Sequence, residues 1–174
     1  DGIETFLMDY TRPETISALV DTVLQRSGGR IDALFNNGAY GQPGAVEDLS
    51  TATLRAQFEA NFFGWHELTR QVIPAMRKYG QGRIVQCSSI LGVVPYRYRG
   101  AYTASKFALE GFMESLAPEV APFGIRTMVV EPGFFRTDLL TPESTSYAES
   151  TIDDYTERTT QTVEAWNGMN GRQG

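Results

Sequence analysis

The alternation of short apolar runs with helical patterns is the feature that most constrains the fold of this 174-residue chain. Four runs are too short and too continuously apolar for surface helices, and predict strands buried on both faces: Ile3–Met8, Ile31–Phe35, Arg83–Cys87 and Arg126–Val130. Strands that alternate with helices favour a parallel sheet with right-handed crossovers. The sequence therefore predicts one doubly wound α/β domain over residues 1–174, with helices on both faces in three α/β/α layers.

Three helices are expected between these strands. The first opens with a capping box at Thr11–Glu14, which includes a proline in the first turn, and closes at Gly28–Gly29. The second runs from about Ser50 to Tyr79, where apolar residues recur at helical spacing. The third runs from about Ala101 to Ala121, and Pro118 is expected to kink it or close it one turn early.

The pattern weakens after Thr137. Residues 141–162 are rich in Thr, Ser, Asp and Glu, which favours a mobile loop with short helices. A disordered, solvated tail is the alternative, because residues 168–174 form a stretch rich in Gly, Asn and Gln.

Charge and cysteine content narrow the class of partner. The net charge is −6 and there is no basic run, which argues against binding to nucleic acid or to an anionic membrane surface. A small-molecule partner is expected instead. The single cysteine, Cys87, cannot form an internal disulfide, and no leader or long apolar stretch is visible, which favours the cytoplasm. No metal-ligand spacing is evident.

Polar and glycine residues follow every expected strand. They are Asp9, Asn36–Gly41, Ser88–Ser89 and Glu131–Gly133. In open α/β sheets ligands bind outside the carboxyl ends of the strands, so these residues indicate a site at that edge. Ordinary turn chemistry explains each cluster taken singly, and that alternative stays open.

Tyr102 and Lys106 lie four residues apart on the third expected helix, and so share one face of it. A phenol titrates near pH ~10, so proton exchange near neutrality needs a pKa shift of about three units, or about 4 kcal/mol. An ammonium at roughly 4 Å contributes about 4 kcal/mol at an effective dielectric near 20. The pair can therefore act as an acid–base group. The structural alternative is a core tyrosine beside a lysine that snorkels outward.

Asn61 lies on the apolar stripe of the second expected helix, where a buried amide needs hydrogen-bond partners. It is either functional or satisfied by a neighbouring carbonyl. Ser89 precedes Tyr102 by 13 residues. Together, Asn61, Ser89, Tyr102 and Lys106 resemble the Asn–Ser–Tyr–Lys set of the short-chain dehydrogenase/reductase family, with its Tyr-x-x-x-Lys motif.

The resemblance spans about residues 1–138. Asp9 matches the adenine-contacting aspartate of the family, and Asn36–Gly41 matches its Asn-Asn-Ala-Gly loop, although the order here is Asn-Asn-Gly-Ala. Residues 132–137 match its Pro-Gly-x-x-x-Thr nicotinamide segment. The resemblance implies a Rossmann-like fold and an NAD- or NADP-dependent alcohol dehydrogenase or carbonyl reductase. No glycine-rich phosphate loop precedes Asp9, so the domain is expected to be incomplete at its N-terminus, and also at its C-terminus.

The resemblance also implies a role for each residue. Tyr102 is the general acid/base, Ser89 polarises the substrate oxygen, Lys106 binds the nicotinamide ribose and lowers the tyrosine pKa, and Asn61 holds a water of the proton relay. The residues expected to bind the cofactor are Asp9, Asn37, Gly38, Tyr102, Lys106, Pro132, Gly133 and Thr137. A non-catalytic Rossmann-like binding module and a sugar-nucleotide epimerase or dehydratase are the alternative functions.

Two further expectations concern substrate and assembly. Residues 134–165 are expected to form the substrate-loop region, with 134–155 as a lid whose apolar side chains favour an apolar or aromatic alcohol or ketone. The second helix is apolar on two faces, through Phe58 and Leu68 on one and Phe62 and Phe63 on the other. A second copy of the chain is expected to cover one of them, giving a dimer or tetramer.

Overall fold

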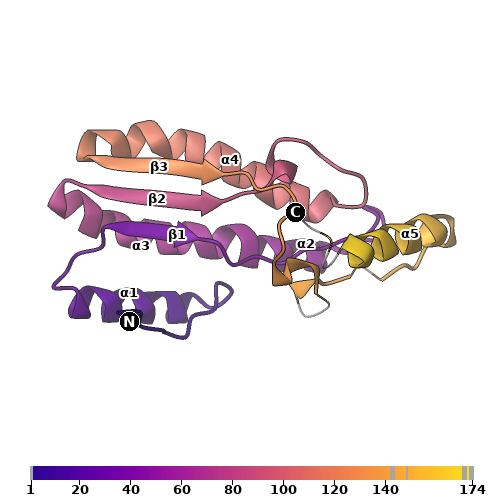
Figure 1. Ribbon diagram of the computed structural model, residues 1–174, viewed down its shortest axis with the longest axis horizontal. Coiled ribbons are helices and arrows are strands. Elements are labelled where there is room, and N and C mark those ends of the chain that lie inside the picture. Colours follow the sequence, from indigo (N-terminus) through magenta and orange to yellow (C-terminus); the bar gives the residue numbers. More distant parts are fainter. Residues whose placement is uncertain (1, 142–143, 148, 170–171, 173–174) are drawn as a thin grey trace.

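Three parallel strands form the sheet of the computed structural model, which describes residues 2–141, 144–147, 149–169 and 172. The strands are β1 (Ala33–Asn36), β2 (Gly82–Cys87) and β3 (Ile125–Val130), in the order β1-β2-β3. Their arrows point the same way in Figure 1. The expected parallel α/β sheet is confirmed.

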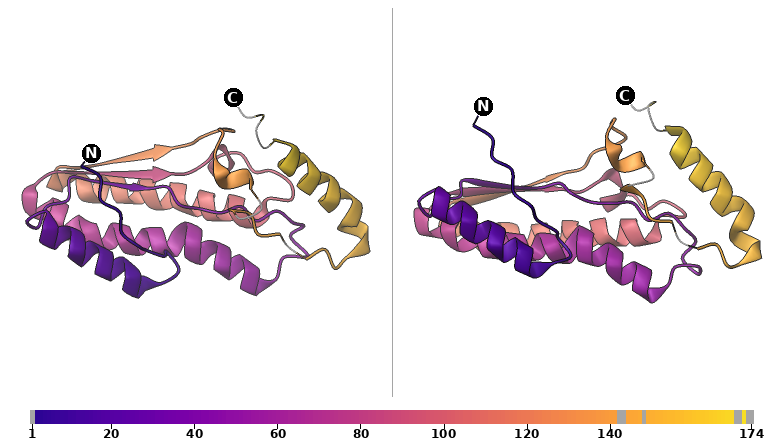
Figure 2. Two further views of the ribbon diagram at one scale, coloured as in Figure 1. Left: turned by 60° about the horizontal axis from the view of Figure 1, so that its bottom comes forward. Right: turned by 90° about the horizontal axis from the view of Figure 1, so that it is seen from below.

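The helices gather on one face of this sheet. The α-helices are α1 (Pro13–Arg26), α2 (Thr51–Phe58), α3 (Gly64–Tyr79), α4 (Gly100–Val120) and α5 (Asp153–Met169). A π-helical turn, η1 (Glu59–Phe63), and three 3₁₀ turns, η2 (Ile90–Gly92), η3 (Ala121–Phe123) and η4 (Asp138–Leu140), complete the set. Figure 2 shows α1, α3 and α4 beneath the sheet, while α5 stands beyond the carboxyl ends of the strands. The described residues thus hold one of the two expected helical layers.

The opposite face of the sheet is open over the described residues. Phe35 and Met128, which flank Val85 in the pairing register, are 58% and 60% exposed. The expectation that the strands are buried on both faces is therefore wrong for this part of the chain, because successive side chains of a strand point to opposite faces and only one face meets helices.

The core lies between the sheet and the helical layer. Its buried side chains are Ile16, Val20, Leu68, Val72, Met76, Ile84, Met113, Leu116, Val120 and Ile125. Each such burial is worth about 1.5–3 kcal/mol relative to exposure. Near the carboxyl ends of the strands, the buried side-chain amides of Asn36 and Gln86 both donate to Thr69 Oγ1, at 3.3 and 3.0 Å.

The first expected strand does not form. Residues 3–8 have no strand structure, and Ile3 and Leu7 are 85% and 99% exposed. Residues 3–8 pair with none of the three strands of the sheet in the described part of the chain. A strand is held by hydrogen bonds to a neighbouring strand, so apolar character alone does not make one.

Two helix boundaries differ from those expected. Arg12, not Thr11, is the N-cap of α1, and no side chain caps that helix, so the expected capping box is wrong. Pro118 does not close α4 early: the helix continues to Val120 and passes into η3. A proline so close to the end of a helix removes one hydrogen bond without displacing a further turn.

The C-terminal part also differs from expectation. Residues 153–169, expected to be loop, short helix or tail, form the 17-residue helix α5. Trp166 anchors this helix: it is buried, and its Nε1 donates to Thr145 Oγ1 at 3.3 Å. Part of the expected tail, residues 170–171 and 173–174, lies outside the described residues.

The second expected helix is divided by the π turn η1. Its N-terminus follows the usual rules, because the Ser50 side chain accepts from Thr53 N at 3.0 Å. The π turn then inserts an extra residue, and such turns are often found at functional sites. The α-helix resumes at Gly64, where a side chain would collide with the Tyr10 carbonyl, so the loop before α1 packs directly on α3.

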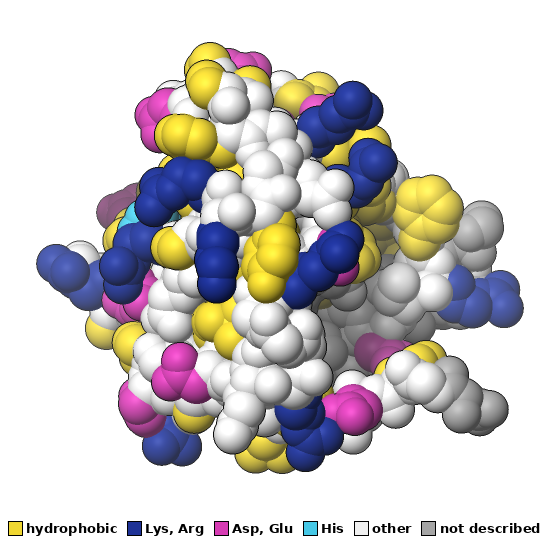
Figure 3. All heavy atoms as spheres, turned by 90° about the vertical axis from the view of Figure 1, so that its left-hand side faces the viewer, with side chains coloured by type: hydrophobic (Ala, Val, Ile, Leu, Met, Phe, Trp, Pro, Cys, Tyr) yellow, Lys and Arg dark blue, Asp and Glu magenta, His cyan; other side chains and the backbone are white. Residues whose placement is uncertain are grey.

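The surface at the amino ends of the strands carries mixed charge. Figure 3 shows this end with Lys and Arg side chains interspersed with those of Asp and Glu. Of the helices in the described part of the chain, none combines the length and apolar character that a membrane span requires.

Candidate active site

A cleft of about 940 Å³ lies at the carboxyl ends of the three strands. Eight of the ten residues singled out from the sequence line it: Asn37, Gly38, Ser89, Tyr102, Lys106, Pro132, Gly133 and Thr137. The other two, Asp9 and Asn61, lie outside its lining. The structure thus brings together residues that are up to 100 positions apart in the chain.

Tyr102 lies in the first turn of α4 and is 7% exposed. A hydrogen bond with the Ser89 side chain lowers its pKa, but burial has the larger effect and raises the pKa to about 12. This direction is opposite to the one expected from the sequence. Burial penalises the phenolate more than the hydrogen bond stabilises it, so the free tyrosine is a proton donor and not a base at neutral pH.

Lys106 lies one helical turn further on and is only 1% exposed, which excludes a lysine that snorkels to solvent. Its Nζ donates to the Cys87 carbonyl at 2.8 Å and lies 4.3 Å from the ring centroid of Trp65. Burial lowers the pKa of Lys106 to about 8. The same Nζ lies over the Tyr102 ring, 5.6 Å from its centroid.

The turn after β2 fixes Ser89. Ser89 is the N-cap of η2, and its Oγ accepts from Leu91 N at 3.1 Å. The next residue, Ile90, donates its N–H to the Pro132 carbonyl at 3.0 Å. This bond ties the end of β2 to the segment after β3, so Ser89 and Pro132 are held on one wall of the cleft.

Asn61 sits in the π turn and is completely buried. Its Oδ1 accepts from Tyr40 N at 3.2 Å, and its Nδ2 donates to Tyr40 O at 3.1 Å. Gln57 Nε2 donates to the same carbonyl at 3.0 Å. The Asn61 side chain therefore holds the loop after β1 in place, which matches the alternative of an amide satisfied by a neighbouring main chain.

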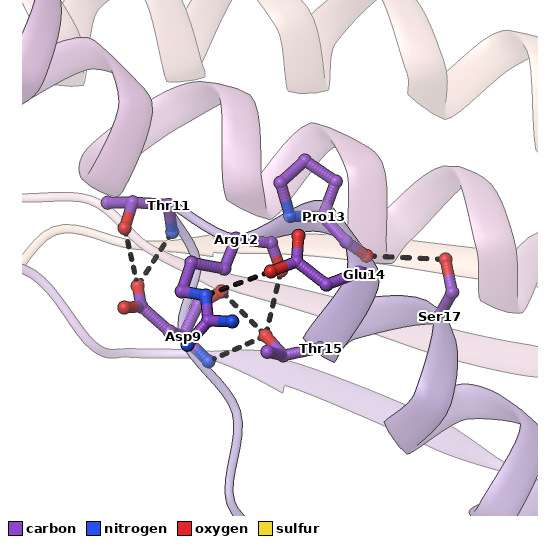
Figure 4. Close-up of polar contacts among 7 residues, drawn as sticks. All are labelled: Asp9, Thr11, Arg12, Pro13, Glu14, Thr15 and Ser17. Atoms are coloured by element: carbon purple, nitrogen blue, oxygen red, sulfur yellow. Dashed lines mark hydrogen bonds and ion pairs between the residues drawn. The ribbon is translucent and has the colours of Figure 1, made fainter.

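The Asp9 side chain stabilises the loop before α1 through hydrogen bonds with Thr11. Figure 4 shows its Oδ1 accepting from both Thr11 N and Thr11 Oγ1, each at 2.8 Å. The main-chain bond, and next the hydroxyl bond, lowers the pKa of this carboxyl. Thr15 Oγ1 accepts from Asp9 N at 3.0 Å and fixes the start of the helix. Asp9 is exposed, so its carboxylate is accessible although it lies outside the cleft lining.

Trp65 is a site residue that the motif does not reveal. It is fully buried, its Nε1 donates to the Gly38 carbonyl at 3.0 Å, and its ring faces the Lys106 ammonium. It thus links the loop after β1 to the lysine. The available signal was its position four residues after Asn61 on the same expected helix.

A second pocket of about 570 Å³ adjoins the cleft. The two share Ile90, Leu91, Phe134 and Trp166. The pocket lies between the segment 94–99 and helix α5, and residues 158–169 of that helix supply much of its lining. Helix α5, which was not expected from the sequence, therefore forms part of the wall of this second pocket.

Comparison with known proteins agrees with this geometry. The family model for short chain dehydrogenases matches residues 1–148. The uncharacterized oxidoreductase YbbO of Escherichia coli K12 is 40% identical over 136 residues, which cover 78% of this chain and 51% of YbbO. A short-chain dehydrogenase from Streptomyces avermitilis has a similar structure, with a TM-score of 0.82 and 40% identity, over 92% of this chain and 59% of that one.

Similar solved structures contain nicotinamide cofactors. One is an NAD⁺-bound xylitol dehydrogenase, with a TM-score of 0.70 and 32% identity over 74% of this chain and 50% of that one. Another is a metagenomic short-chain oxidoreductase in complex with NADP. It has a TM-score of 0.71 and 33% identity, and the match covers 77% of this chain and 61% of that one. The chain spans about half the length of the curated relatives it matches. From motif, fold and these matches, the chain belongs to the short-chain dehydrogenase/reductase family.

Proposed function

We propose that the intact protein transfers a hydride between NAD or NADP and the carbon of an alcohol or ketone. The observation that carries this proposal is the convergence of Ser89, Tyr102 and Lys106 on one cleft, with the lysine buried. Burial of an ammonium costs free energy unless hydrogen bonds or opposite charges compensate for the lost hydration. Here it is tied to a main-chain carbonyl one helical turn from a buried phenol.

In the reduction direction, the residues act on the substrate oxygen. Ser89 Oγ and Tyr102 Oη donate hydrogen bonds to the carbonyl, which polarises it. Tyr102 then gives its proton to the alkoxide that develops. Because its pKa is about 12 in the structure, the phenol is still protonated at neutral pH and is ready to act as the acid.

In the oxidation direction, Tyr102 must first lose its proton. Oxidised NAD or NADP, when bound, would accept the hydride that leaves the alcohol carbon. Loss of the Tyr102 proton would be favoured by any positive charge held near its hydroxyl, since such a charge opposes the effect of burial. Lys106, with a pKa of about 8, stays mainly protonated at neutral pH, and its ammonium would hold the bound cofactor.

The residues of the cleft fit the nicotinamide end of such a cofactor. Lys106 offers an ammonium, the Asn37–Gly38 main chain forms one wall, and the segment 132–137 forms another. Thr137 keeps this last segment folded, since its Oγ1 accepts from Leu139 N at 3.3 Å. Relatives that hold either NAD⁺ or NADP leave both cofactors open for this chain. A cytoplasmic enzyme with a small-molecule substrate stays part of the proposal.

We expect the intact protein to reduce ketones with NADH or NADPH in a panel followed by cofactor absorbance. The cofactor that supports turnover identifies the preference, and the reactive ketones identify the substrate class. Cofactor binding without turnover of any alcohol or ketone would favour an epimerase or dehydratase. Failure to bind either cofactor would favour the non-catalytic binding module.

We expect the intact protein to be a homo-oligomer. Phe62, Phe63, His66 and Phe112 form an aromatic cluster across η1, α3 and α4, with ring centroids 5.4–6.0 Å apart. Phe63 remains 47% exposed and Phe107 of α4 is 42% exposed. An apolar surface of this kind favours a second copy. Light scattering at micromolar concentration should give at least twice the monomer mass, and a monomer mass would contradict the expectation.

A further inference from the structure

Arg99 occupies an unusual position, three residues before Tyr102 and directly before α4, whose N-cap it provides. Its neighbour Tyr98 has φ 58°, and among the described residues no other non-glycine residue has a positive φ. This strained conformation is uncommon and often marks functional sites. The strain is held by Gly44, whose N–H donates to the Tyr98 carbonyl at 3.1 Å. The backbone thus fixes Arg99 next to the catalytic turn.

The Arg99 guanidinium is buried, and no carboxylate among the described residues forms an ion pair with it. The residue is 5% exposed, and its Cζ lies 3.9 Å from the ring centroid of Trp166, on which it stacks. Its Nη1 is buried and has no hydrogen-bond partner in the described part of the chain. Burial lowers the pKa of Arg99 to about 10, so the group is still charged at neutral pH. A buried, unpaired charge is costly unless a ligand completes it.

The pocket around Arg99 is apolar with cationic groups at intervals. Arg99 lines it together with two exposed arginines, Arg97 and Arg158. The apolar lining is Ile90, Leu91, Val94, Phe134, Ala165, Trp166 and Met169. None of the residues that line the pocket in the described chain is Asp or Glu. The described lining therefore offers an apolar surface and positive charge, and includes no carboxylate to neutralise that charge.

We propose that this pocket binds the far end of a substrate whose apolar body ends in a carboxylate, and that Arg99 binds that carboxylate. The planar guanidinium matches a carboxylate with two parallel hydrogen bonds, and Trp166 already fixes its plane. The pocket adjoins the cleft, so the body of the substrate can run from Ser89 and Tyr102 to Arg99. The inference rests on the proposed oxidoreductase function and replaces the uncharged substrate expected from the sequence.

The first test measures binding without turnover. Octanoate and 1-octanol share an apolar body and differ in the carboxylate, and Trp166 in the pocket reports either by fluorescence. We expect octanoate to bind the intact protein at least about tenfold more tightly than 1-octanol, since hydrogen bonds to a charged group are worth more than neutral ones. Arg99→Met should remove this difference. Arg77→Met is the matched control, because Arg77 also covers an aromatic ring, that of Phe123, but lies outside the pocket.

The second test measures selectivity in turnover. Oxo acids from 4-oxopentanoate to 8-oxononanoate are compared with their methyl esters, and the ratio of kcat/KM for acid to ester is taken at each length. In the wild-type protein we expect the ratio to reach about 10 to 100 at the best length. Arg99→Met should bring it close to one, and Arg77→Met should leave it unchanged.

The outcomes separate this inference from the proposed function. Ketone reduction by the wild-type protein with an acid-to-ester ratio near one at every length would overturn the carboxylate site and leave the oxidoreductase standing. Octanoate binding that depends on Arg99, with no ketone reduced, would support the anion site and overturn the proposed reaction. The wild-type comparison alone decides the carboxylate preference, so the test stands even if Arg99→Met fails to fold.

Discussion

Tyr102→Phe in the intact protein should lower kcat for ketone reduction by about 10²–10⁴-fold, the usual contribution of a positioned general acid. The substitution keeps the buried ring and removes only the hydroxyl and its hydrogen bond with Ser89. Loss of one neutral hydrogen bond costs about 0.5–1.5 kcal/mol, so the variant should still fold and bind cofactor. Steady-state kinetics, thermal unfolding and cofactor titration measure the three effects separately.

Tyr79→Phe is the matched control. The Tyr79 hydroxyl also makes one hydrogen bond, which it donates to the Gly28 carbonyl, and Tyr79 lies outside the lining of the cleft. It should retain wild-type kcat. The pH profile adds an independent readout. Oxidation needs the deprotonated phenol, so the wild-type oxidation rate should rise with pH, while the residual rate of Tyr102→Phe should lack that rise. Turnover by Tyr102→Phe within a few-fold of wild type would exclude Tyr102 as the proton donor.

Lys106→Arg should lower activity by about 10²-fold although it preserves the charge, since small misplacements at a reacting centre have effects of that size. Lys106 is 1% exposed and enclosed by the Cys87 carbonyl and the Trp65 ring, so the broader guanidinium does not fit the same space. Overpacking of this kind also costs about 1–3 kcal/mol of stability. Kinetics, cofactor titration and thermal unfolding together test the prediction.

The chain has only one other lysine, Lys78, which makes the control direct. Lys78 lies near the end of α3 and is exposed, so Lys78→Arg should change neither activity nor cofactor affinity. Weakened cofactor binding by Lys106→Arg alone would assign the ammonium to the cofactor as well as to the tyrosine. A fully active Lys106→Arg would show instead that position 106 needs charge only.

The spacing of Tyr102 and Lys106 could be interpreted from the sequence because a helix makes the distance between i and i+4 nearly independent of the rest of the fold. The location of the cleft followed from strand ends, since all parallel strands present their carboxyl ends to one edge. Ser89 and Pro132 were therefore placed near it without knowledge of any contact, and Thr137 was added by the resemblance to the Pro-Gly-x-x-x-Thr segment.

Other features depend on partners that no local pattern records. Residues 3–8 have the composition of a strand, but strand formation requires a neighbour. The pKa of Tyr102 is decided by burial, which depends on packing around α4 rather than on the spacing to Lys106. Helix α5 has few apolar residues, and its docking rests on one buried tryptophan, Trp166, within an otherwise polar stretch.

The π turn at Glu59–Phe63 determines where this helical region can lose a residue. A π turn holds one extra residue while the helix on either side keeps its register, whereas a residue deleted from a regular α-helix rotates everything after it by about 100°. A deletion within Glu59–Phe63 should therefore leave Trp65 on the Lys106 ammonium and Gly64 against Tyr10, and should remove only local contacts of the turn. A deletion further along α3 has no extra residue to remove and should displace the buried side chains that follow it. In a deletion scan across residues 59–79, followed by thermal unfolding, the π turn should be the segment that tolerates a lost residue best.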